Sequence, residues 1–118
     1  MDRIASGVAS GFGATAEVDF RVVALPLINH ATETVFIADA ASELVGLDNV
    51  DRDSALVMAS EDFSYMLNHS PGAYIRIGNG DQPGACQVHN PGYDFNDAIL
   101  PLGASLFARL AERKLARS

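Results

Sequence analysis

The spacing of apolar residues predicts both helices and strands along this chain. In the segment after the first glycines, Val18, Phe20 and Val22 alternate with charged residues, which is the period-two pattern of a half-buried strand. Elsewhere the apolar residues recur every three or four positions, as on one face of a helix. The predicted helices cover 2–13, 31–45, 60–68 and the segment after Asp97, and the predicted strands cover 15–25, 55–58 and 73–77. This order of elements predicts an α/β or α+β fold.

Polar residues and glycine mark the ends of the predicted helices. Asn29 is expected to cap the second helix, and Gly46 to end it. Ser60 is expected to cap the third helix, and Asn96 or Asp97 the last one.

The predicted strand 15–25 has few partners within the sequence. Pro26 ends it, and two short predicted strands follow. One amphipathic strand needs a sheet to join, so we expect polypeptide outside these 118 residues to contribute to that sheet.

Composition narrows the class of protein. The chain is 48% apolar and 19% charged, which suits a packed core, and its net charge of −7 argues against nucleic acid or an anionic membrane as a partner. Cys86 is the single cysteine, so no internal disulfide forms. No secretory signal and no membrane-length apolar segment is evident, and we therefore expect a cytoplasmic protein.

The long polar loop 78–97 is the first place to look for chemistry. His89 precedes Asn90 and Pro91, which stiffen the chain and can hold an imidazole in one orientation. A plain surface histidine is the alternative. Cys86 and His89 also have the spacing of half a zinc site, but a tetrahedral site needs two more ligands, and His30 and His69 are the remaining histidines.

The segment from Ser60 to Asp62 allows two interpretations. Glu61 and Asp62 suit the start of a helix, where carboxylates stabilise the positive end of the dipole. Alternatively, the segment lines a pocket at the carboxyl end of the predicted strand 55–58. A triad of Ser60, His89 and Asp94 has no supporting motif, since H-E-x-x-H, G-x-S-x-G and the P-loop pattern are all absent.

Four motifs of the second half, in this order, resemble the C-terminal end of the metal-dependent amidohydrolases. That group includes hippurate hydrolases, indole-acetyl-amino-acid hydrolases and N-acyl-amino-acid amidohydrolases, relatives of aminoacylase and carboxypeptidase G. The motifs are MASEDFSYM at 58–66, PGAYIRIG at 71–78, HNPGYDFND at 89–97 and LPLGA at 100–104.

The resemblance implies a division of the chain and a set of roles. Residues 1–28 match the last helix and strand of a lid domain, which often dimerises, and residues 29–118 match the C-terminal part of the catalytic domain. His89 matches the last ligand of a pair of divalent metals, Zn, Mn or Co. The resemblance also implies that Ser60, Glu61 and Asp62 border the substrate pocket, and that Tyr93 and Asp94 support the loop of His89.

The resemblance further implies that this chain is a fragment. The family's other metal ligands and its general-base glutamate lie in an N-terminal portion that these 118 residues do not include. We therefore expect a parent enzyme that hydrolyses the amide bond of N-acyl or N-aroyl amino acids, and a chain that is inactive alone and associates with the rest of the protein or as a homo-oligomer. The alternative is a non-catalytic interaction module that pairs through the strand 15–25.

Overall fold

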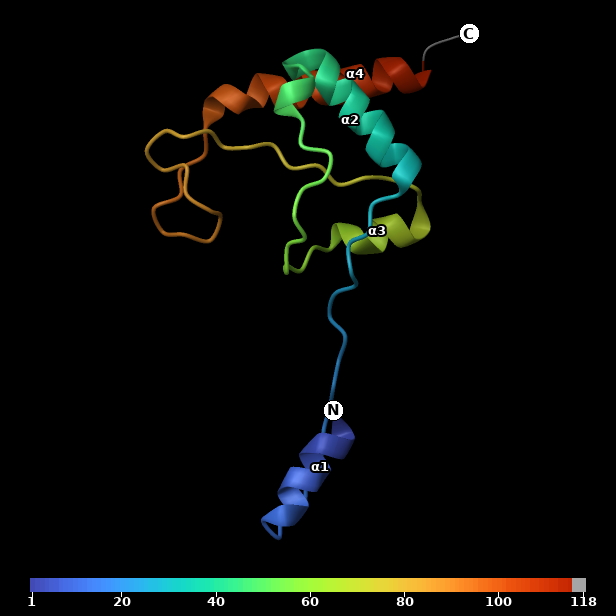
Figure 1. Ribbon diagram of the computed structural model, residues 1–118, viewed down its shortest axis with the longest axis vertical. Helices are drawn as coiled ribbons and strands as arrows, with labels where there is room; N and C mark the ends of the chain where they lie inside the picture. The colour runs from blue at the N-terminus through green and yellow to red at the C-terminus, as the bar shows by residue number, and fades with distance from the viewer. Residues whose placement is uncertain (116–118) are drawn as a thin grey trace.

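The computed structural model describes residues 1–115, in which helices are joined by long loops (Figure 1). The α-helices are α1 (Asp2–Gly11), α2 (Ala31–Val45), α3 (Phe63–His69) and α4 (Leu100–Leu115). A short 3₁₀ turn at Leu47–Asn49 follows α2, and another at Asp97–Ile99 precedes α4. No helix among residues 1–115 is long and apolar enough to cross a membrane.

Helices α2 and α4 pack against each other and form the core. Ala40 is fully buried, and it clusters with Ala41 of α2 and Leu106 of α4. The two alanines have short side chains, which lets a leucine of the facing helix fill the space between the helices. Val50, Ile75 and Leu110 are partly buried against this cluster. This cluster therefore belongs to one small helix pair covered by two loop residues, and Leu67 of α3 is buried outside it.

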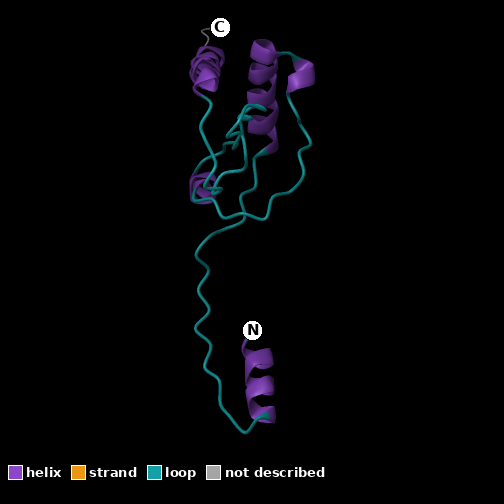
Figure 2. Cartoon of the chain, turned by 90° about the vertical axis from the view of Figure 1, so that its left-hand side faces the viewer, coloured by secondary structure: helices purple, strands orange, loops and turns teal. Residues whose placement is uncertain are grey.

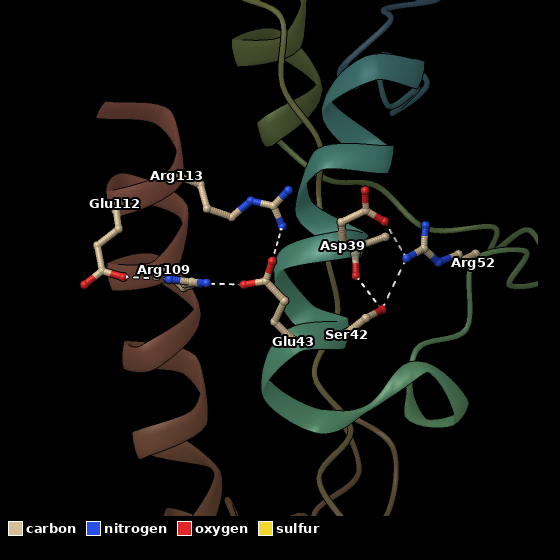
Figure 3. A network of polar contacts seen from close by, with 8 residues as sticks. Asp39, Ser42, Glu43, Arg52, Arg109, Glu112 and Arg113 are labelled. Carbon is tan, nitrogen blue, oxygen red and sulfur yellow. Dashed lines mark hydrogen bonds and ion pairs between the residues drawn. The ribbon is translucent and has the colours of Figure 1, made fainter. Parts of the chain in front are cut away.

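Charged side chains reinforce the same helix pair (Figure 3). Glu43 of α2 accepts hydrogen bonds from Arg109 Nε at 2.6 Å and from Arg113 Nη1 at 2.9 Å. Arg109 also bonds Glu112, and the Arg113 guanidinium lies 5.2 Å from the centre of the Phe36 ring. These groups are partly exposed, so each ion pair contributes at most about 1 kcal/mol.

The expected α/β or α+β fold is wrong for the described part of the chain. Residues 1–115 contain helices and loops but no strand, and the three predicted strands 15–25, 55–58 and 73–77 are loops (Figure 2). A strand exists only where backbone groups pair with a neighbouring strand. No such ladder is present within residues 1–115, and the apolar side chains of 55–58 are exposed. Leu56 is 98% and Met58 100% exposed.

Helix α1 lies apart from the other helices. Residues 14–28 form an extended connection between α1 and α2 (Figure 1), and the longest dimension of the molecule is 68 Å. No residue of α1 is buried, and the side chains of Ile4, Val8 and the C-cap residue Phe12 are all largely exposed. The boundary at residue 28 between lid and catalytic portions stays a prediction.

Two helix starts differ from the sequence prediction. His30 is the N-cap of α2, and the side chain of Asn29 pairs instead with the backbone of Tyr74. Its Nδ2 donates to the Tyr74 carbonyl at 2.9 Å, and its Oδ1 accepts from the Tyr74 N–H at 2.8 Å. Helix α3 has Asp62 as its N-cap, two residues after the predicted Ser60. The predicted span of α2 and its end at Gly46 are confirmed.

Candidate functional site

His89 lies in the loop 78–97, which several turns shape. The imidazole is exposed, and φ of His89 is +69°, in the left-handed region. The Asn90 N–H bonds the Gln87 carbonyl at 3.2 Å, which closes a turn with His89 at its third position. Asn90 shapes the following turn, because its Oδ1 accepts from the Gly92 N–H and its carbonyl accepts from the Tyr93 N–H. The loop thus presents His89 to solvent between two consecutive turns.

The two residues predicted to support this loop take part in its backbone hydrogen bonds. The Tyr93 N–H bonds Asn90, and the Asp94 N–H donates to the Gly84 carbonyl at 2.9 Å. The Asp94 carbonyl also accepts from Asn79 Nδ2 at 2.8 Å. Their support of a metal ligand stays a prediction.

The described residues around His89 do not supply a full set of metal-binding side chains. Among residues 1–115, no group of three or more His, Cys, Asp or Glu side chains is arranged to hold a metal ion. Cys86 is half-buried, with Sγ 3.6 Å from the Gly84 carbonyl. One exposed imidazole on a shaped loop fits the role of a single ligand to a metal whose other ligands come from elsewhere. The described residues do not make a complete metal site.

Glu61 is held at the start of α3. Its Oε1 accepts a hydrogen bond from the Phe63 N–H at 3.3 Å, and its carbonyl accepts one from the Ser64 hydroxyl at 2.7 Å. The Phe63 N–H, and after it Asp62 and the Tyr74 hydroxyl, stabilise the carboxylate and lower the pKa of Glu61. The carboxylate in turn raises the pKa of Tyr74. The Phe63 ring of α3 also lies 5.7 Å from the Tyr74 ring, measured between ring centres, and this contact joins α3 to the loop 72–77.

Ser60 and Asp62 are both exposed. Within residues 1–115, no hydrogen bond or ion pair joins the segment 60–62 to the loop of His89. The assignment of Ser60, Glu61 and Asp62 to a substrate pocket stays a prediction.

Three amide side chains at the base of the loop had no predicted role in shaping it. The Asn96 side chain donates to that of Gln82, and the side chains of Asn79, Gln82 and Asn96 each bond backbone groups of the loop. Their only signal in the sequence is the richness of this loop in asparagine and glutamine, which does not say which groups meet.

A groove beside the helix pair exposes part of the core. It encloses about 680 Å³ and runs between the end of α2, α4 and the loop 75–78. Its lining is largely apolar, with Leu44, Val45, Ile75, Ile77 and Leu102 among the residues.

Comparisons with known proteins agree on one group of hydrolases. The chain is 31% identical over 113 residues to hippurate hydrolase of Campylobacter jejuni, covering 96% of this chain and 29% of that protein. It is 33% identical over 92 residues to IAA-amino acid hydrolase ILR1-like 5 of Arabidopsis thaliana, covering 76% of this chain and 21% of that protein. The chain is 29% identical over 113 residues to thermostable carboxypeptidase 2 of Saccharolobus solfataricus, covering 94% of this chain and 28% of that protein.

The chain spans less than a third of the length of these curated relatives. No solved structure matches it. The family model described as peptidase family M20/M25/M40 matches residues 3–113, nearly the whole sequence. The resemblance drawn from the four motifs is therefore confirmed, and the chain belongs to peptidase family M20/M25/M40.

Proposed function

We propose that this chain is part of a metal-dependent hydrolase that cleaves the amide bond of N-acyl or N-aroyl amino acids. The observation that carries the proposal is the kind of substrate in the names of its relatives. Hippurate hydrolase, IAA-amino acid hydrolase and N-acetylcysteine deacetylase are all named for an amino acid that carries an acyl group on nitrogen. The shared feature of these compounds is the amide bond, while the acyl groups differ.

Within this enzyme, we assign His89 as one ligand of a pair of divalent metals, Zn, Mn or Co. A neutral imidazole binds such ions through a ring nitrogen, and the turns on both sides of His89 restrict where that nitrogen lies. Bound metals supply a polarised amide carbonyl and a water of lowered pKa. The remaining ligands and the general base come from polypeptide outside these 118 residues, so the chain alone is inactive.

The other predicted roles belong to the same proposal. Ser60, Glu61 and Asp62 border the substrate pocket, and Tyr93 and Asp94 support the His89 loop. Residues 1–28 belong to a lid portion that associates with another copy, and residues 29–118 belong to the catalytic portion. Exposed apolar side chains support association, since Phe12, Val23 and Met58 are each more than four-fifths exposed. A free cysteine suits a reducing cytoplasm.

The test uses the native polypeptide that contains these residues, loaded with Mn, Co or Zn. We expect it to release glycine from hippurate. Changes to residues that only orient a metal ligand lower metal affinity or activity by about 10–100-fold. Loss of the ligand itself should cost more, so His89→Ala should lower kcat/KM by at least about 100-fold. His69→Ala is the control, because His69 is an exposed histidine at the end of α3.

Two results contradict the proposal. If neither His89→Ala nor His69→Ala loses activity, His89 is not a ligand. Absence of hydrolysis of hippurate and of other N-acyl amino acids by the metal-loaded polypeptide excludes the amidohydrolase, and favours a non-catalytic module that pairs through residues 15–25.

A further inference from the structure

The loop that carries His89 is closed at its base by three side-chain amides, which we call the amide clasp: Asn79, Gln82 and Asn96. Asn79 bonds two backbone groups on the returning side of the loop. Its Nδ2 donates to the Asp94 carbonyl at 2.8 Å, and its Oδ1 accepts from the Asn96 N–H at 2.9 Å. These contacts span 15 and 17 residues, so one side chain fixes both ends of the loop together.

Asn96 bonds back to the outgoing side of the loop. Its Nδ2 donates to the Asn79 carbonyl at 3.2 Å and to Gln82 Oε1 at 3.3 Å, while its Oδ1 accepts from the Ala98 N–H at 3.1 Å. Gln82 Nε2 donates to the same Asn79 carbonyl at 2.7 Å. The clasp is thus reciprocal, and through Ala98 it is attached to the 3₁₀ turn that leads into α4.

Two glycines show how closely the sides of the loop approach. Gly80 has φ of +83°, and a Cβ there would lie 3.3 Å from Nδ2 of Asn96 on the returning side of the loop. Gly84 has φ of +89°, and a Cβ there would lie 2.7 Å from Asp94 Cβ. The second contact lies beside the hydrogen bond from the Asp94 N–H to the Gly84 carbonyl. The backbone of 80–94 is therefore held together at two levels before it reaches His89.

His89 adopts a conformation that needs such support. A φ of +69° is uncommon for a residue with a Cβ, and such residues persist where their surroundings over-determine the backbone. The turns at Gln87 and Asn90 give His89 this conformation within a loop whose two ends the clasp holds together and attaches to the turn before α4, so the conformation depends on both.

We propose that Asn79 and Asn96 are positioning residues for His89, which hold the loop 80–95 closed so that the imidazole meets its metal in one place. This inference rests on the proposed function of His89 as a ligand. Asn79 and Asn96 do not touch the metal; they act through the backbone between them.

The first arm of the test uses NMR on the native polypeptide that contains these residues. Asn79→Ala removes both hydrogen bonds of that side chain, whereas Asn79→Asp keeps an acceptor for the Asn96 N–H and loses the donor to Asp94. Asn68→Ala is the control, because Asn68 is an exposed asparagine of α3 outside the loop. The readouts are the backbone order parameter of His89 and the strong intraresidue NOE between its amide and α protons that a positive φ gives. Amide exchange in α2 and α4 reports whether the fold survives.

We expect an order parameter of about 0.85 for His89 in the unchanged chain and in Asn68→Ala. In Asn79→Ala it should fall below about 0.6, with loss of the strong NOE and with α2 and α4 still protected. Asn79→Asp should lie between the two. An unchanged order parameter and NOE in Asn79→Ala overturn the proposal. Loss of protection in α2 and α4 also overturns it, because the clasp would then support the whole fold rather than His89.

The second arm measures metal affinity of the native polypeptide by competition with a chelator. Asn79→Ala should weaken Zn²⁺ affinity by about 10–100-fold, the range for groups that orient a ligand, and Asn79→Asp should restore part of it. An unchanged affinity in Asn79→Ala, where His89→Ala does lower it, overturns the positioning role. If His89→Ala itself leaves the affinity unchanged, the proposed function fails, while the NMR arm still decides whether the clasp orders the loop.

Discussion

Replacement of Leu106 by alanine tests whether the pair of α2 and α4 is the stable part of this chain. Leu106 is 4% exposed and contacts the cluster of Ala40 and Ala41. The substitution removes three buried carbon atoms, and at about 0.8 kcal/mol for each the transfer term is about 2.4 kcal/mol. The groove next to Leu106 is already open to solvent, so a closed cavity does not form and the penalty for an empty cavity is small. We expect a loss of about 2–3 kcal/mol in the free energy of unfolding.

The matched control is Leu115→Ala, the same substitution on the same helix at a residue that is 76% exposed. Its cost should be below about 0.5 kcal/mol. Urea unfolding followed by helical circular dichroism measures both variants, and with a slope of about 1–2 kcal/mol per molar the midpoint of Leu106→Ala should fall by at least about 1 M. If the two variants have midpoints within error of each other, the α2 and α4 contact does not hold the chain together.

Two further predictions concern charged side chains. Glu43→Gln should lower the free energy of unfolding by about 0.5–1 kcal/mol at low salt, because Glu43 pairs with both Arg109 and Arg113, and this loss should be smaller in 1 M NaCl. Urea titrations at both salt concentrations measure the loss, and Glu112→Gln is the control with a weaker expected effect. A loss that does not depend on salt contradicts the prediction. The pKa of Glu61 is lowered in the folded chain by the Phe63 N–H first, so its stabilising contribution is complete above its ordinary value of 4.5 and is lost as the pH falls through the lowered pKa. Urea midpoints between pH 6 and pH 3 should therefore fall less steeply for Glu61→Gln than for the unchanged chain, and equal slopes refute this assignment.

The helix predictions succeeded where the signals were local. The span of α2 from Ala31 to Val45 and its end at Gly46 agree with the structure, because apolar spacing and a glycine of positive φ act within one or two turns. Asn96 caps the turn before α4, as one of the two predicted candidates. The caps expected from Asn29 and Ser60 were wrong. The Asn29 side chain pairs with the backbone of Tyr74, 45 residues away. A prediction from neighbouring residues cannot include a partner at that distance along the chain.

The strand predictions failed for a different reason. The alternation of Val18, Phe20 and Val22 is real, but a strand is defined by hydrogen bonds to a neighbour, and none is present within residues 1–115. The candidate site shows the same limit. His89 and its loop could be selected from motifs, whereas the pairing of Asn79 with Asp94 and Asn96 depends on the path of the loop between them.

The sequence by itself determined the family and the helices. The four motifs, in their order along the chain, indicate the hydrolase family. The helices follow from the short-range spacing of apolar residues. Only the tertiary structure decided that α2 and α4 form the core, that residues 55–58 remain uncovered, and that an amide clasp closes the loop of His89. These features join residues tens of positions apart. Their energies come from burial and hydrogen bonding between distant segments, which the pattern along one segment does not encode.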